Sequence, residues 1–361
     1  MRGLDLPSDS TGLENPLAPS LIAAAMRAWM VVVPRERAED IRRTLLERGV
    51  LLKQARIAHE GDSILLPTRE RVDLGFPTKE GEFEEGFVAV RSYKDVIEVP
   101  PSARRLLPSS FDVVGDIAVI KIPEELREHR MAIGDAIRRW NPKIGVVLED
   151  RGVKGEHRIR EIDVIGGEPR TTTVHTEHGL HYRVDLSRAY FSPRLASERK
   201  RIADLIDAGE TVADPFAGVG PYSILIAKRR RPSEVHASDA NPKAVRFLRE
   251  NVAANRADHV TVRRGDAHAI LRQVAPVDRV ILDLPHSAMD YLGAAFRALG
   301  ARGTVHVYGI LEEAEEGEAR DRIQSAARTA GFRMKGLSQH HVRAYSPTKY
   351  QTAFDVTVVR G

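Results

Sequence analysis

The feature that most constrains the fold of this 361-residue chain is a regular alternation of strand-like and helix-like segments from residue 195 onward. Short apolar runs end in turns, and most are followed by an amphipathic stretch of helical length. The strand-like runs lie in TVADP, EVHASD, VTVRRGD, RVILDLP, GTVHVYGI and TAFDVTVV. This alternation is typical of a doubly wound α/β sheet, in which ligands bind outside the carboxyl ends of the strands.

Four of these segments place an aspartate where the strand ends, at Asp214, Asp239, Asp266 and Asp283. The turn DPFAGVGP follows the first strand, and glycines there let the backbone approach a ligand closely. The turn is not G-x-G-x-x-G and has no P-loop lysine, so nothing in it would hold a triphosphate. Asp239 is placed to accept from both ribose hydroxyls, and Asp266 to reach an exocyclic amine. Such acids without phosphate-binding residues indicate S-adenosylmethionine rather than NAD or ATP.

Two smaller α+β modules are predicted before this domain. In the first, WMVVVP, a helical stripe and ILLPT read as strand, helix and strand, and the polar passage PTKEGEFEEG follows without an assigned structure. In the second, the strand pair FDVVGDIAVIKIP precedes the helix EELREHRMAIGDAIRRW. Met26 and Met30 are alternative start positions. The predicted boundaries are 1–27 for a flexible leader, 28–100 and 101–186 for the two modules, and 187–361 for the α/β domain.

The composition excludes several classes of protein. The chain has no cysteine, which excludes disulfides, a thiol nucleophile and thiolate metal sites, and fits a reducing cytoplasm. No apolar run approaches the ~20 residues of a membrane span, and the 13 histidines show no ligand spacing, so no catalytic metal is expected. The net charge of +4 accompanies recurrent basic clusters such as SERKRIAD and AKRRRP. We therefore expect a cytoplasmic, monomeric protein that acts on nucleic acid.

The motifs taken together resemble those of the archaeal and eukaryotic-type tRNA (guanine-N1)-methyltransferases, which modify position 37. The resemblance rests on DPFAGVGP, SDANPKAV, GDA, LDLP and AYFSPRLASERKRI, and extends upstream through KGEHRIREIDVIGGE and GDIAVIKIPEEL. The first module is similar to the extra N-terminal domain of the archaeal form. The resemblance implies a Rossmann-like class I S-adenosylmethionine-dependent methyltransferase domain preceded by two small α+β domains. It also implies tRNA as the partner, bound at its anticodon arm and outer corner.

Methylation of guanine N1 requires removal of the N1 proton and stabilisation of charge on O6. A carboxylate with a raised pKa suits the first task and an arginine the second. By the resemblance, Glu198 is the general base, Arg158 lies near O6, and Tyr190 and Arg194 line the pocket. The cofactor contacts expected are Arg194, Asp214, Phe216, Gly218, Gly220, Asp239, Ala240, Asp266, Ala267, Asp283 and Pro285.

Asp283 departs from the family pattern, which usually has asparagine before Leu284 and Pro285. Asparagine both donates and accepts, whereas an ionised aspartate only accepts. A protonated Asp283 would regain a donor, and an ionised one could itself assist removal of the N1 proton. Methylation at guanine N2 therefore stays open, as do aminocarboxypropyl transfer of the wybutosine pathway and tRNA binding without turnover. The retained FSPRL and Leu-Pro favour methyl transfer.

Overall fold

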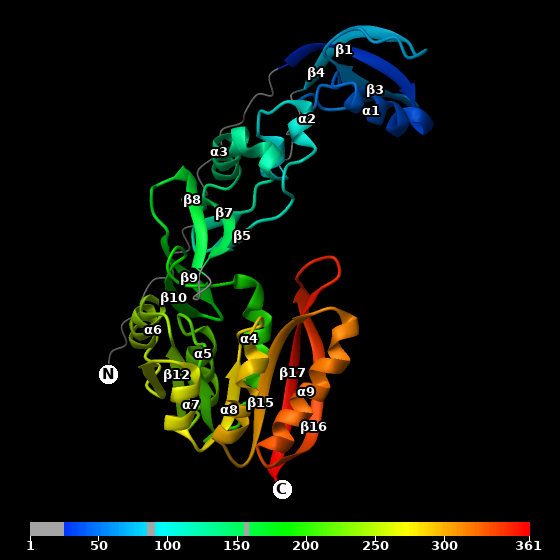
Figure 1. Ribbon diagram of the computed structural model, residues 1–361. Helices are drawn as coiled ribbons and strands as arrows, with labels where there is room; N and C mark the ends of the chain where they lie inside the picture. The colour runs from blue at the N-terminus through cyan, green and yellow to red at the C-terminus, as the bar shows by residue number, and fades with distance from the viewer. Residues whose placement is uncertain (1–24, 85–90, 155–158) are drawn as a thin grey trace, which may run out of the picture. The chain divides into compact units, whose positions relative to one another are not determined.

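The computed structural model describes residues 25–84, 91–154 and 159–361, and Figure 1 traces their helices and strands. The chain divides after Arg91 into two compact units. None of the helices in the described ranges is long and apolar enough to cross a membrane.

The first unit is a four-stranded antiparallel sheet with one helix. The strand order is β2-β3-β1-β4. The elements are β1 Ala25–Pro34, α1 Ala38–Glu47, β2 Ala58–Glu60, β3 Ser63–Thr68 and β4 Thr78–Glu84. Ile41 and Leu45 of α1 pack against Val31 and Val33 of β1. The polar passage PTKEGEFEEG supplies β4, because its backbone pairs with β1 and needs only Phe83 to enter the core.

The second unit opens with another four-stranded sheet, in the order β5-β6-β7-β8, followed by a separate hairpin. Gly134 of α3 lies against the backbone of β8, since a Cβ added there would come within 2.1 Å of the Ile165 carbonyl oxygen. The helix therefore packs closely on the sheet. The elements are α2 Pro101–Arg104, β5 Asp112–Val114, β6 Ile117–Ile120, α3 Arg130–Trp140, β7 Val146–Lys154, β8 Ile159–Gly167, β9 Thr172–Glu177 and β10 Leu180–Asp185.

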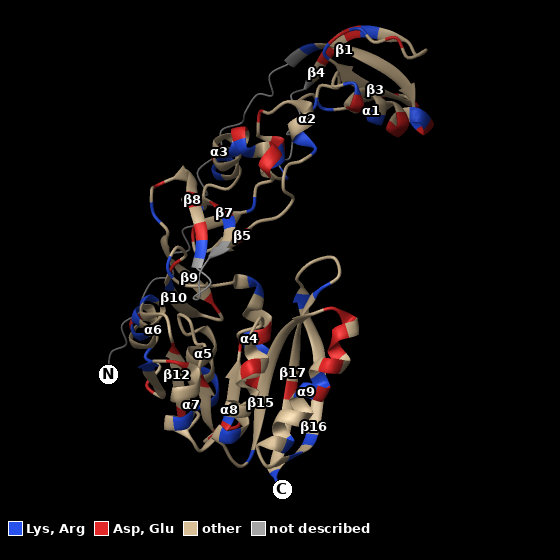
Figure 2. Cartoon of the chain, viewed as in Figure 1, with Lys and Arg blue, Asp and Glu red and all other residues tan. Residues whose placement is uncertain are grey.

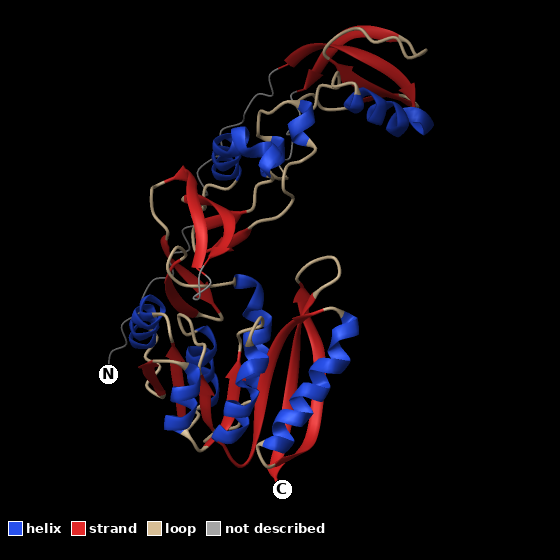
Figure 3. Cartoon of the chain, in the orientation of Figure 1, coloured by secondary structure: helices blue, strands red, loops and turns tan. Residues whose placement is uncertain are grey.

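A seven-stranded sheet in the order β13-β12-β11-β14-β15-β17-β16 follows, with β17 antiparallel to both of its neighbours. Figure 3 shows this sheet in red with helices in blue around it. The strands are β11 Thr211–Asp214, β12 Glu234–Asp239, β13 Val260–Arg264, β14 Val277–Leu282, β15 Leu299–Leu311, β16 Phe332–Ala344 and β17 Tyr350–Arg360. The helices are α4 Ala196–Asp204, α5 Pro221–Arg230, α6 Pro242–Ala254, α7 Ala267–Val274, α8 Leu292–Ala298 and α9 Glu316–Thr329.

Alternating side chains of the strands build two separate cores, one on each face of this sheet. Val212 and Ile281 belong to the core that contains α4, α5 and α6. Their neighbours Ala213 and Val280 belong to the core that contains α7, α8 and α9. Since successive side chains of a strand point to opposite faces, the doubly wound arrangement predicted from the alternation is confirmed.

Candidate functional site

A cavity of about 230 Å³ lies at the carboxyl ends of β11, β12 and β14, where the sequence predicted a ligand site. Phe216 lines it, and its ring meets the ring of Tyr291 edge-on at a centroid distance of 4.9 Å. The residues that line the cavity are Tyr190, Leu195, Pro215, Phe216, Gly218, Asp239, Ala240, Asn241, Ala244, Gly265, Asp266, Ala267, Asp283, Leu284, Pro285, His286, Tyr291, Ile310, Arg343, Tyr345 and Gln351.

The two glycines of the turn after β11 serve different purposes. Gly218 lines the cavity, and its backbone N–H donates to Asp239 Oδ2 at 2.9 Å. Gly220 lies outside the lining and precedes α5 with a φ of 96°. A Cβ on Gly220 would lie 2.5 Å from Leu248 Cδ1, so glycine there lets α5 pack against α6. Only Gly218 is placed to approach a ligand.

Asp239 and Asp266 both line the cavity and are both fixed by backbone donors. The other oxygen of Asp239 accepts from the Asn241 N–H at 2.8 Å. Asp266 caps α7, since its Oδ1 accepts from the backbone N–H groups of His268 and Ala269. Each carboxylate oxygen can accept more than one hydrogen bond. Both acids can therefore take ligand hydroxyl or amine donors without losing their orientation.

Asp214 lies beneath the cavity and not on its lining. It is fully buried; Oδ2 accepts from the Ser223 hydroxyl at 2.6 Å, and Oδ1 has no partner among the described residues. Burial raises its pKa to about 7, and the charges of Asp283 and Asp239 act in the same direction. Its buried position indicates that Asp214 holds the end of β11 in place and does not contact a ligand directly.

Asp283 follows β14 and lines the cavity. Across the described residues its carboxylate makes neither a hydrogen bond nor an ion pair within 4.0 Å. Burial raises its pKa to about 6, against the lowering effect of Arg199. A carboxylate of this kind changes between a proton donor and a proton acceptor close to neutral pH.

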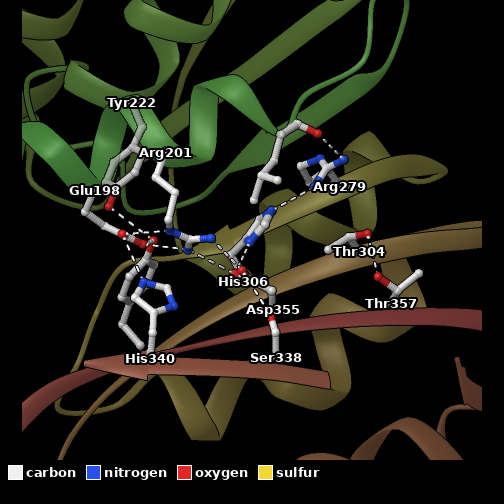
Figure 4. A network of polar contacts seen from close by, with 12 residues as sticks. Glu198, Arg201, Tyr222, Arg279, Thr304, His306, Ser338, His340, Asp355 and Thr357 are labelled. Carbon is white, nitrogen blue, oxygen red and sulfur yellow. Dashed lines mark hydrogen bonds and ion pairs between the residues drawn. The ribbon is translucent and has the colours of Figure 1, made fainter. Parts of the chain in front are cut away.

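Glu198 is almost fully buried in α4 and lies off the cavity lining. Its oxygens accept from Arg201 at 2.8 and 2.9 Å, from the Tyr308 hydroxyl at 2.6 Å, and pair with His340 Nε2 at 3.2 Å (Figure 4). Burial alone would raise its pKa, but the hydrogen bonds from Arg201 and Tyr308 outweigh burial and hold the pKa below the ordinary value. The expectation that this candidate base has a raised pKa is therefore wrong.

A chain of buried polar groups continues from Glu198 into the sheet (Figure 4). Arg201 donates to Asp355 at 2.6 Å, and Asp355 pairs with His306 Nδ1 at 2.6 Å. Arg279 lies 2.9 Å from His306 Nε2 and is held by Glu210. Arginine can only donate, so His306 is assigned as the neutral tautomer with its proton on Nδ1, consistent with burial lowering its pKa. This network fixes Arg201 from both sides and keeps Glu198 ionised.

Of the remaining residues implied by the resemblance, some line the cavity and others do not. Tyr190 lines the cavity, is 41% exposed, and has the guanidinium of Arg160 5.8 Å from its ring centroid. Arg194 is not part of the lining, and its Nε donates to Asp112. Arg158 lies outside the described residues. Ala240, Ala267 and Pro285 line the cavity as expected.

One group of lining residues was missed by the sequence analysis. Arg343, Tyr345 and Gln351 come from β16, β17 and the loop between them. Arg343 Nε donates to Gln351 Oε1 at 2.9 Å, and Tyr345 is 49% exposed with its ring 5.9 Å from that of His286. No local motif marks these positions. The only signal in the sequence was a tyrosine and an arginine close to a Ser-Pro dipeptide.

Three family models match the chain in succession. Residues 31–74 match the tRNA methyltransferase 5 N-terminal domain, residues 94–171 the TYW2 N-terminal domain, and residues 173–335 the TRM5/TYW2 methyltransferase domain. A curated relative, the Pyrococcus abyssi tRNA (guanine(37)-N(1))-methyltransferase Trm5b, is 38% identical over 91% of this chain and 98% of its own length. The chain belongs to the TRM5/TYW2 methyltransferase family.

Solved structures agree with this assignment. The crystal structure of Trm5b from Pyrococcus abyssi matches 92% of this chain and 99% of its own, with a TM-score of 0.71 and 37% identity. A structure described as the complex of aTrm5 and tRNALeu matches 91% of the chain at a TM-score of 0.66 and 28% identity. The predicted family and fold class are confirmed: a methyltransferase domain with a mixed seven-stranded sheet follows the N-terminal domains.

Proposed function

We propose that this chain transfers the methyl group of S-adenosylmethionine to N1 of guanosine 37 in tRNA. The observation that carries the proposal is one cavity in which the fixed acids Asp239 and Asp266 lie with the unpaired carboxylate of Asp283. The near full-length likeness to the Pyrococcus abyssi Trm5b supports the same substrate.

The lining residues fit S-adenosylmethionine. Asp239 is placed to accept from the ribose hydroxyls and Asp266 to accept from the adenine amine, while Gly218 lets the backbone come close. The turn has no lysine or arginine for phosphates, which fits a nucleoside cofactor rather than a nucleotide. Once bound, the cofactor supplies an electrophilic methyl carbon attached to a positively charged sulfur.

A tRNA substrate is consistent with the basic residues of the second unit. The last turn of α3 carries Arg138 and Arg139 (Figure 2). Arginine and lysine on helix ends can contact phosphates and give binding that depends on RNA shape. In our proposal the second unit contacts the anticodon arm and the first unit contacts the outer corner of the tRNA. In the same proposal the enzyme acts in the cytoplasm.

The target base must leave its stack to reach a cavity at the strand ends. Tyr190 and Tyr345 both line the cavity and expose their rings. Exposed aromatic rings can stack on an unstacked base, and such contacts contribute about 1–3 kcal/mol per base. These two tyrosines therefore support a nucleobase rather than a small metabolite as the acceptor.

Product mapping tests this function. The full-length chain is incubated with S-adenosylmethionine and transcripts that carry guanosine, adenosine or inosine at position 37, and nucleosides are identified by mass spectrometry. We expect N1-methylguanosine only from the transcripts with guanosine at this position. N2-methylguanosine would move the reaction to another atom. A tRNA that carries 4-demethylwyosine at position 37 is tested in parallel, and an aminocarboxypropyl product on it would favour the reaction of the Methanocaldococcus jannaschii aminocarboxypropyltransferase, which is 28% identical over 252 residues. Cofactor binding without any product would favour a tRNA-binding protein.

A further inference from the structure

One residue of the cavity lining, Tyr190, is held by a charged group from outside the cavity. Tyr190 is 41% exposed, whereas the next two residues, Phe191 and Ser192, are buried. The Phe191 ring packs against the ring of His175 at a centroid distance of 5.1 Å. The guanidinium carbon of Arg160 lies 5.8 Å from the Tyr190 ring centroid, which is within the range of a cation–π contact. The backbone of this segment is therefore fixed by Phe191, and the exposed ring by Arg160.

Arg160 reaches Tyr190 from β8, and two further contacts fix its own side chain. Nη1 donates to Asp150 Oδ2 at 2.9 Å, in an ion pair whose side chains are 10% and 8% exposed. Nη2 donates to the Phe191 carbonyl oxygen at 3.4 Å. Asp150 is fixed in its turn, since its Oδ1 accepts from the Gly152 N–H at 2.9 Å. A planar guanidinium serves a carboxylate, a carbonyl and an aromatic ring together, because its N–H donors point outward in its plane and its face stays available.

A second arginine ties the buried part of the same segment. Arg199 of α4 lies 5.3 Å from the Phe191 ring centroid, and its Nη2 donates to the Ser192 carbonyl oxygen at 3.0 Å. It therefore fixes the chain after Tyr190, whereas Arg160 lies against the Tyr190 ring itself. Arg160 is not part of the cavity lining. Any effect of Arg160 on a ligand must therefore pass through Tyr190.

We propose that Arg160 is a positioning residue for the methyl transfer, and that it holds the Tyr190 ring in the orientation in which this ring stacks on the target guanine. This inference rests on the proposed function. An exposed aromatic side chain can adopt several rotamers. A base that stacks on a ring already held in one rotamer loses less conformational entropy on binding, and its reacting atom is better aligned. Arg160 thus prepares the surface that receives the base.

The contact links two parts of the second unit. Arg160 and Asp150 belong to the β5–β8 sheet, whereas Tyr190 precedes α4 of the methyltransferase domain. The proposed cofactor acceptors Asp239 and Asp266 lie after strands of the seven-stranded sheet and are fixed by their own backbone donors. Loss of Arg160 should therefore disturb the placement of the base and leave cofactor binding unchanged.

A double-mutant cycle on single-turnover methylation of a guanosine-37 transcript tests this inference. The full-length chain carries Arg160→Gln together with Asp150→Asn, so that no buried carboxylate is left without its partner. At saturating tRNA this paired variant should lower the rate by roughly 10- to 100-fold, and Tyr190→Ala should lower it by a similar factor. Adding Tyr190→Ala to the paired variant should lower the rate no further than Tyr190→Ala alone, because Arg160 acts through that ring. Cofactor affinity of the paired variant, measured by calorimetry, should equal that of wild type.

Two further variants complete the design. Arg160→Lys keeps a positive charge beside Asp150 but loses the planar guanidinium, so its rate should lie between those of wild type and the paired variant. It replaces the paired variant in the cycle if circular dichroism shows that the paired variant is unfolded. Arg246→Met is the matched control, since it removes an exposed arginine that pairs with Glu250 on α6, and it should leave the rate unchanged.

The outcomes separate the function from the role of Arg160. If the wild-type chain forms no N1-methylguanosine, the proposed function fails. If it forms the product but the paired variant keeps the wild-type rate, the function stands and the positioning role is overturned. The same conclusion follows if the losses of the paired variant and of Tyr190→Ala multiply, or if cofactor affinity falls by the same factor as the rate.

Discussion

Replacing Asp214 with asparagine should stabilise the protein increasingly as the pH rises. Asp214 is fully buried, and one of its oxygens has no partner among the described residues. Its pKa is raised from the ordinary 3.8 to about 7, chiefly by burial. The folded state thus retains a proton that the unfolded chain releases. Stability from this group is fully present below pH 3.8 and is lost as the pH rises to about 7.

The size of the effect follows from these two pKa values. One unit of pKa corresponds to about 1.4 kcal/mol, so the stability that Asp214 contributes falls, relative to its value below pH 3.8, by roughly 2 kcal/mol at pH 5 and by roughly 4 kcal/mol at pH 8. Asparagine stays neutral and can still accept from the Ser223 hydroxyl. Its amide group has no partner beside it, which costs about 1–3 kcal/mol at every pH. The advantage of Asp214→Asn should therefore grow by roughly 2–3 kcal/mol between pH 5 and pH 8.

Urea unfolding of the cofactor-free chain at pH 5, 6, 7 and 8 measures this growth. Circular dichroism is the suitable signal, because Trp29 and Trp140 both lie outside the seven-stranded sheet. Asp321→Asn, an exposed substitution of the same type, should show no such dependence. A difference between wild type and Asp214→Asn that is constant across the four pH values would refute the reasoning, since Asp214 would then not titrate as a buried acid.

Two further substitutions probe the cofactor wall and the support of α4. Asp239→Ala removes the carboxylate that accepts from the Gly218 and Asn241 N–H groups and that is expected to bind the ribose hydroxyls. It should weaken cofactor binding, measured by calorimetry, by about 10- to 100-fold. An unaltered affinity would contradict the cofactor assignment. Glu177→Gln leaves the buried guanidinium of Arg199 without its ion pair and should lower the free energy of unfolding by about 3–5 kcal/mol. A loss below about 1 kcal/mol would mean that this ion pair contributes little to the stability of the fold.

Much of the methyltransferase domain followed from the sequence. Apolar runs, acids and glycines at short spacing predicted β11, β12 and β14 with Asp239 and Asp283 at their ends. Parallel strands bring their carboxyl ends together, so residues distant in sequence could be assigned to one cavity. The same pattern left α7, α9 and β16 unassigned. In β16 the side chains are largely polar or partly exposed, and the strand is specified by pairing with β17 rather than by its own apolar alternation.

The chemistry of individual acids was less predictable. Glu198, Asp214 and Asp283 are all carboxylates, yet the first is held ionised by hydrogen bonds, the second is buried away from the cavity, and the third faces it without a partner. A pKa depends on burial and on charges that arrive from other strands and helices. For Glu198 those charges include Arg201 of the same helix, and the Tyr308 and His340 contacts come from β15 and β16.

The sequence by itself determined the strand-and-helix alternation from β11 to β14, the cofactor-binding turn and the position of Asp283 at a strand end, because these depend on local periodicity and short motifs. Only the tertiary structure decided that Arg343 lines the same cavity as Asp283, and that Glu198 is enclosed by its own partners. The Tyr308 and His340 contacts of Glu198 join residues 110 and 142 positions apart through strand order and side-chain packing. No local pattern encodes them, since the pairing of β16 with β17 and of β17 with β15 sets which side chains meet.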